Sequence, residues 1–206
     1  MIFHKYLFLL SFLFACLSGC ALWPEKRDPS TVFDLGPQRS YGSEAVNPHA
    51  IEAILLIPPV SASPWLDNPG IQYRLAYRDG SRPDAYAQHR WVMTPAQLFT
   101  ERLRARFAGA SRGVVTAQDG AKADYALRIE LEDFSQSFDA AQSSKVTVRV
   151  RASLIDVNTR ALHAQRSFST DRPAAPNAPG AAQSLAAASD AVIENLLIWT
   201  AQTLKK

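Results

Sequence analysis

The chain has 206 residues, a formal net charge of +3 at pH 7 and 20% charged residues. Such a small positive excess is not the broad basic surface of a nucleic-acid-binding protein, so we predict no nucleic-acid partner. Both cysteines, Cys16 and Cys20, lie within the first twenty residues, so the rest of the chain has no thiol for a disulfide, a metal site or a nucleophile. Stability must therefore come from a hydrophobic core, and the length suits a single domain.

The chain begins with an apolar segment that is typical of a secretory signal. Lys5 precedes about 14 largely apolar residues, fewer than the roughly 20 that a helix needs to cross a bilayer. Small residues end the segment, as they do before a signal-peptidase site. The segment ends with Leu17, Ser18 and Gly19, and Cys20 follows. We predict a signal peptide over residues 1–19, and the alternative is an uncleaved or simply secreted chain.

This tetrad resembles the lipobox of bacterial lipoproteins, in which the cysteine becomes lipidated. The resemblance implies that Cys20 is the first residue of the mature protein and carries covalent lipid, palmitate included, with no other cofactor. Two acyl chains already give stable membrane attachment where one does not. In Gram-negative bacteria an Asp after the cysteine retains a lipoprotein in the inner membrane, but here the residue is Ala21. The resemblance therefore implies an outer-membrane location facing the periplasm.

We interpret residues 20–50 as the lipidated cysteine and a flexible tether. Four prolines interrupt a mixture of charged and small residues that shows no sustained period. Within the tether, only the run from Thr31 to Leu35 has the composition of an edge strand. The folded domain is predicted to cover residues 51–206.

The first part of the domain is predicted to form strands. Residues 51–57 are mostly apolar and are stopped by two prolines, as in a largely buried strand. Residues 61–70 have the composition of a loop, and residues 71–75 alternate between apolar and polar as in a second strand. Asp79-Gly80 is typical of a tight turn, after which residues 86–91 can return as a strand.

A capped helix is predicted to follow. Thr94 suits the N-cap, with Pro at the first helical position and Gln three residues after the cap, and Gly109 lies where the helix should end. Arg102, Arg104 and Arg106 could bind a phosphate or a lipid headgroup. We favour a solvated helix face, because no Gly-rich loop or interleaved aromatic accompanies them.

Period-two alternation returns in the second half of the chain. Residues 125–132 and 146–155 are predicted to be antiparallel strands with one wet face. The polar connection over residues 134–144 is interpreted as a loop. A turn over residues 156–160 leads into a third strand over residues 161–168.

A proline-rich link over residues 171–180 is expected to break the sheet before a long C-terminal helix. The apolar stripe of that helix is Leu185, Ala188, Val192, Leu196 and Trp199. We expect the stripe to pack on the sheet, and docking of a partner or a membrane is the alternative. The order of elements predicts an α+β fold, a mostly antiparallel sheet with two helices packed on one face, preceded by a signal peptide and a tether.

Short motifs extend this interpretation from fold to family. In order they are Val32–Leu35, Ile54–Val60, Pro64–Asp67, Ile71–Arg74 and His89–Trp91. Together with the lipobox, they resemble the ABC-type transport auxiliary lipoprotein family over nearly the whole mature chain. The resemblance implies a non-catalytic outer-membrane lipoprotein that supports lipid transport and membrane integrity. The implied partners are a periplasmic transporter subunit with an MCE (mammalian cell entry) domain and further copies of the chain in a ring.

The sequence itself offers no catalytic motif. His89 and His163 have no ligand residue at metal-binding spacing, and neither a Gly-x-Ser-x-Gly elbow nor a phosphate loop is present. We therefore predict that the protein is not an enzyme and binds no metal. Because aromatic residues in loops often anchor interfaces, the candidate partner contacts are Trp65, Leu66, Tyr73 and Trp91. Trp91 could equally fill the core.

Two other functions remain open at this point. An outer-membrane lipoprotein that regulates peptidoglycan synthesis would have the same anchor, tether and domain size. A direct periplasmic lipid carrier would require an apolar cavity, which the sequence neither shows nor forbids.

Overall fold

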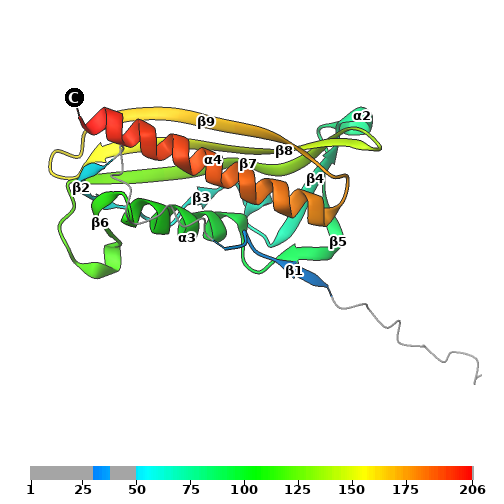
Figure 1. Ribbon diagram of the computed structural model, residues 1–206, viewed down its shortest axis with the longest axis horizontal. Helices are drawn as coiled ribbons and strands as arrows, with labels where there is room; N and C mark the ends of the chain where they lie inside the picture. Colours follow the sequence, from blue (N-terminus) through cyan, green and yellow to red (C-terminus); the bar gives the residue numbers. More distant parts are fainter. Residues whose placement is uncertain (1–29, 38–49, 206) are drawn as a thin grey trace, which may run out of the picture.

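A computed structural model of the protein describes residues 30–37 and 50–205. These residues form a curled, mixed sheet of nine strands, and the two long helices cover the same face of it (Figure 1). The predicted α+β class and the placement of two helices on one face are confirmed. The predicted signal peptide over residues 1–19 lies outside the described residues, as does most of the predicted tether.

The elements follow one another along the chain with these bounds. The strands are β1 (Thr31–Phe33), β2 (Ile51–Leu56), β3 (Ser61–Ala62), β4 (Gly70–Leu75), β5 (Pro83–Trp91), β6 (Ser111–Val115), β7 (Tyr125–Ala140), β8 (Ser143–Asp156) and β9 (Leu162–Ala174). The helices are η1 (Pro64–Leu66), α2 (Ala76–Asp79), α3 (Pro95–Ala108), η2 (Ala117–Asp119) and α4 (Ala178–Leu204).

The long strand β7 organises the sheet. One of its edges pairs antiparallel with β8, which in turn pairs antiparallel with β9. Its other edge pairs in succession with β2, β3 and β4, all parallel, because these three segments advance along β7 in the same direction. β6 lies beyond β2, whereas β5 and then β1 lie beyond β4. The long pairings are thus antiparallel, as predicted, while the short strands add a parallel part that the sequence did not indicate.

The predicted loop over residues 134–144 is wrong, because β7 continues through it to Ala140. Phe134 and Phe138 are buried on the core face, and Gln136 lies between them on the same face, fully buried. Its side-chain amide donates to Ser144 Oγ at 2.8 Å and to the carbonyl oxygen of Ala175 at 2.9 Å. These hydrogen bonds satisfy the amide of Gln136, which lies on the face of β7 where the alternation of the strand predicts an apolar residue.

The predicted break over residues 171–180 is also too early, because β9 runs to Ala174. Pro173 is tolerated there since β9 is an edge strand, where a missing N–H costs no ladder bond.

The β4–β5 connection also differs from the prediction, since the short helix α2 occupies the place of the expected tight turn. β6 was not predicted as a strand.

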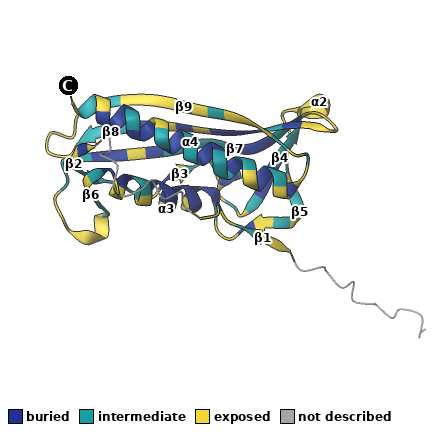
Figure 2. Cartoon of the chain, viewed as in Figure 1, coloured by how far each residue is buried: buried dark blue, intermediate teal, exposed yellow. Residues whose placement is uncertain are grey.

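Both long helices are confirmed. Thr94 and Gln97 form the predicted capping box of α3, and Phe99, Leu103 and Phe107 are fully buried. The five residues of the predicted α4 stripe are all buried. The core therefore lies between the sheet and these two helices, whereas most of β9 is exposed (Figure 2).

β1 lies within the predicted tether, yet it pairs in parallel with β5, Thr31 opposite His89. Leu35 is 6% exposed and belongs to the core. The folded unit therefore includes residues 31–37 and begins before the predicted boundary at Ile51.

Candidate interaction surface

Arg102 joins a segment in the middle of the predicted tether to both helices. From α3, its guanidinium contacts the carboxylate of Asp190 on α4 through two bonds, of 2.5 and 2.9 Å. The same side chain donates to the carbonyl oxygens of Leu35 at 3.0 Å and Gly36 at 2.9 Å. Only 7% of Arg102 is exposed. It therefore fixes the point at which the N-terminal segment enters the domain.

The other arginines of α3 are also bound to the fold. Arg106 pairs with Glu194 of α4 at 2.8 Å, and Arg104 donates twice to the carbonyl oxygen of Ile57. The prediction of a solvated arginine face is therefore wrong, since all three guanidinium groups contact other elements. These contacts could not be predicted from sequence patterns because the partners lie far away along the chain.

Trp65 keeps part of its surface exposed. It lies in η1, half-buried, and the guanidinium of Arg74 sits 4.9 Å from the centre of its ring. Arg74 also faces Asp133, whose carboxyl group is largely buried. Burial raises the pKa of Asp133. A hydrogen bond from Ser135 and the charges of Arg149 and Arg74 lower it, but by less. Trp65 remains a predicted contact residue, backed by a cation–π contact that orients its ring.

Tyr73 is also half-buried, but it belongs to a different face. Its ring lies 4.8 Å from Tyr86 and 5.9 Å from Phe138, and the hydroxyl of Tyr86 donates to Gln136 Oε1 at 2.7 Å. Burial, and then Tyr73, raises the pKa of Tyr86 to about 12. Because successive side chains of a strand point to opposite faces, Tyr73 and Arg74 lie on opposite sides of β4. Tyr73 therefore does not join Trp65 in one patch.

Leu66 and Trp91 do not have the exposed surface that a contact residue needs. Leu66 is fully buried and Trp91 is 1% exposed. The indole of Trp91 packs edge-on against Phe134, with the ring centres 5.6 Å apart. Its Nε1 has no hydrogen-bond partner among the described residues. The alternative, that Trp91 fills the core, is the one that the structure shows.

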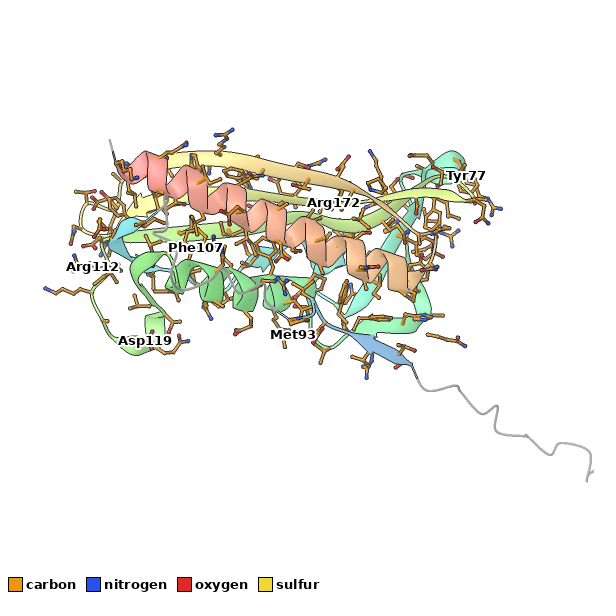
Figure 3. All side chains as sticks on the ribbon, in the orientation of Figure 1. Tyr77, Met93, Phe107, Arg112, Asp119 and Arg172 are labelled. Carbon is orange, nitrogen blue, oxygen red and sulfur yellow. The ribbon has the colours of Figure 1, made fainter. Side chains whose placement is uncertain are left out.

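Sequence reasoning missed three exposed apolar residues on β1 and the segment next to it, which we call the apolar patch. Val32, Val92 and Met93 are 46%, 56% and 37% exposed. The backbone N–H of Val92 donates to the carbonyl oxygen of Phe33 at 2.8 Å, which holds the end of β5 against β1. Met93 lies just before α3 (Figure 3). No sequence pattern marks these residues, because their exposure depends on how β1 docks.

Three hollows of the described surface are lined mainly by polar and charged groups. One of about 380 Å³ contains Glu52, Arg112, Asp124 and Asp156. Arg112 and Asp119 lie at the end of the molecule opposite Tyr77 (Figure 3).

Within residues 30–37 and 50–205, no three His, Cys, Asp or Glu side chains are placed to hold a metal ion. No helix in those ranges is both long and apolar enough to cross a membrane. Cys20, with the lipobox residues Leu17, Ser18 and Gly19, lies outside the described residues, so its lipidation stays a prediction.

These features define an α+β domain whose described residues include a half-buried tryptophan and exposed apolar residues. The model of the ABC-type transport auxiliary lipoprotein component family matches residues 33–196. The chain therefore belongs to this family of auxiliary transport lipoproteins, as its motifs predicted.

Two solved structures with TM-scores above 0.5 support the fold. The chain is similar to a protein from Xanthomonas campestris at 19% identity and a TM-score of 0.68, with 86% of this chain and 95% of that one covered. It is also similar to an uncharacterized protein at 13% identity and a TM-score of 0.58, covering 86% and 98% of the two chains. The PelC dodecamer of Paraburkholderia phytofirmans matches at 14% identity, with a TM-score of 0.44 and 73% and 90% coverage. No curated protein matches the chain.

Proposed function

We propose that the protein is a non-catalytic outer-membrane lipoprotein that docks the periplasmic conduit of an ABC/MCE-type lipid transport system. The observation that carries the proposal is the family match over residues 33–196, since the family is an auxiliary component of ABC-type transport. In this proposal the lipid on Cys20 anchors the chain, and Ala21 directs it to the outer membrane. The role is mechanical: the domain positions a transporter subunit and thereby supports membrane integrity.

The way the N-terminal segment is attached supports this mechanism. β1 pairs with β5, and Arg102 binds the carbonyl groups that follow β1. A membrane anchor upstream of β1 then pulls on a segment that is bonded to the sheet and, through Arg102, to both long helices. Such an attachment keeps one end of the domain towards the anchor.

We further propose that the apolar patch of Val32, Val92 and Met93 contacts the transporter subunit, with Trp65 as a second contact. Exposed apolar side chains that lie next to one another are typical of interfaces, whereas scattered ones need no explanation. The patch lies beside the entry point of the tether, so a partner bound there is held near the membrane. Copies of the chain arranged as a ring around the conduit would repeat this contact with closed symmetry.

The test is affinity purification of the native lipidated protein from detergent-solubilised envelopes. We expect recovery of an MCE-domain protein, with much less recovered when Cys20→Ala removes the anchor. Val92→Glu should also lower recovery, because it places a charge in the apolar patch. Val157→Glu is the matched control: Val157 is 37% exposed and lies in the turn between β8 and β9, away from the patch.

Recovery of a peptidoglycan synthase without any transporter subunit would contradict the proposal and favour a regulator of cell-envelope synthesis. Equal recovery with Val92→Glu and with Val157→Glu would leave the docking function standing and remove the apolar patch from it.

A further inference from the structure

β9 leaves one long backbone edge without a partner strand. The strand has 13 residues, and within the described part of the chain it pairs with β8 alone. It runs along the border of the sheet, beside α4, and most of it is exposed (Figures 1 and 2). Up to Arg172, the unpaired N–H and C=O groups of such an edge are a template for one more strand, whereas Pro173 has no N–H and its carbonyl oxygen accepts a bond from Ser184 of α4.

A groove lies directly beside this edge. It has a volume of about 430 Å³, and its walls come from Arg166–Ser169 of β9 and from Asn195, Ile198, Trp199 and Gln202 of α4. Its lining is mostly polar, but it includes one pair of aromatic rings, Phe168 and Trp199, with centres 5.7 Å apart. Each of the two residues is 9% exposed. An apolar side chain projecting from an added strand would therefore meet the exposed part of these two rings, with polar groups around it.

The same side of β9 carries uncompensated positive charge. Because side chains alternate along a strand, Arg166, Phe168 and Arg172 all face the side on which α4 packs. The guanidinium of Arg166 lies 5.3 Å from the centre of the Phe168 ring. Neither Arg166 nor Arg172 forms an ion pair with a carboxylate of the described residues.

The nearby carboxylates are already engaged elsewhere. Asp190 and Glu194 of α4 bind the arginines of α3. Asp171 accepts bonds from Lys145 and Thr147, and the alternation of β9 directs it to the other face of the sheet. An incoming ligand that supplies carboxylates would therefore find two guanidinium groups available to it.

We propose that the β9 edge and the groove beside it bind an extended acidic segment of a partner protein by strand addition. Residues directly opposite each other in a strand pair share a face, so the register is defined. The segment should carry an apolar residue opposite Phe168 and carboxylates opposite Arg166 and Arg172. These carboxylates are six residues apart, about 20 Å along a strand.

The charge pattern also favours a partner protein over self-pairing. If the β9 edges of two copies paired in parallel and in register, or antiparallel with Arg166 opposite Arg172, the arginines of both copies would face each other, and like charges directly opposite are destabilising. An acidic segment removes that repulsion and gains charge-assisted hydrogen bonds.

The experiment uses the mature chain with Cys20→Ala and a capped nine-residue peptide. The peptide is threonine throughout, except for aspartate at its second and eighth positions and valine at its fourth and sixth, so it fits β9 in either direction. NMR titration should shift the backbone amides of Ser167 and Ser169 and those of the facing side of α4. A peptide N-methylated at alternate residues should not bind, because strand addition needs its N–H groups. Asparagine in place of aspartate should weaken binding.

Variants test the charge pattern. Arg166→Gln and Arg172→Gln should each weaken binding about two- to five-fold, the range expected for exposed ion pairs. Arg128→Gln is the matched control, since Arg128 lies on the opposite face of the sheet and should bind as the unchanged chain does. Thermal melting of each variant shows that the fold is retained.

Four results would overturn the proposal: no shift at β9, binding that survives N-methylation, variants of Arg166 and Arg172 that bind unchanged, or β9 shifts that depend on protein concentration without peptide. The last would assign the edge to a second copy of the chain. None of these results bears on docking of a transporter subunit, which the envelope purification tests separately.

Discussion

Replacing Arg102 by alanine should destabilise the domain by about 3 kcal/mol. The change removes two bonds to Asp190 and two to the backbone carbonyls that follow β1. Removing one partner of a buried ion pair costs about 3–5 kcal/mol, because the other charge stays buried without its counter-ion. The side chain of Asp190 is 20% exposed and so keeps some solvation, which places the expected loss at the lower end of that range.

The assay is urea unfolding of the mature Cys20→Ala chain, followed by tryptophan fluorescence. Arg102→Ala, Asp190→Ala and the double variant form a cycle, and their non-additivity should be about 1–3 kcal/mol. Arg128→Ala, a change at an exposed arginine, should alter the free energy of unfolding by less than about 0.5 kcal/mol. Limited proteolysis should also cleave residues 31–37 faster in Arg102→Ala. A loss below about 1 kcal/mol for Arg102→Ala, with additive single variants, would refute the reasoning.

Three further predictions concern local features of the fold. Thr94→Ala removes the N-cap of α3 and should cost about 1 kcal/mol in urea unfolding, whereas an unchanged midpoint would mean that the cap contributes nothing. Gly180→Ala should destabilise the start of α4, because the new methyl group would lie 2.6 Å from Cβ and 2.7 Å from the carbonyl oxygen of Ala175; a variant with an equal or higher melting temperature would contradict this close contact. The pKa of Asp133 is raised in the folded state, so folding disfavours its charged form. As the pH rises from below 3.8 through the raised pKa, the ionisation of Asp133 therefore lowers the free energy of unfolding. Asp133→Asn should therefore raise the urea midpoint at pH 7, and that gain should disappear at a pH below 3.8; a constant gain at both pH values would exclude titration as its cause.

Local chemistry made α3 and α4 predictable. The Thr94 capping box and the α4 stripe depend on residues three or four positions apart, and that spacing can be read directly from a sequence. The strands β7 and β8 were also indicated where apolar and polar residues alternate. The loop prediction over residues 134–144 failed because Gln136 holds a core position, and its amide is satisfied only by partners that the fold brings together.

The contact surfaces were less predictable for the same reason. Trp65 and Trp91 were both candidate contacts, yet Trp65 is half-buried beside Arg74 and Trp91 lies in the core. Arg102 could be taken for a solvated residue because its partners, Asp190 and Leu35, are 88 and 67 positions away. Exposure and long-range pairing follow from tertiary packing, and a single sequence does not reveal them.

The most direct test of the central claim is binding between two purified proteins. The mature lipoprotein domain and the periplasmic MCE-domain subunit from the same cell would be mixed, and complex formation measured by size-exclusion chromatography with light scattering. The proposed function predicts a stable complex that Val92→Glu weakens and Val157→Glu does not. Two separate peaks at every concentration, with both proteins folded, would contradict the account.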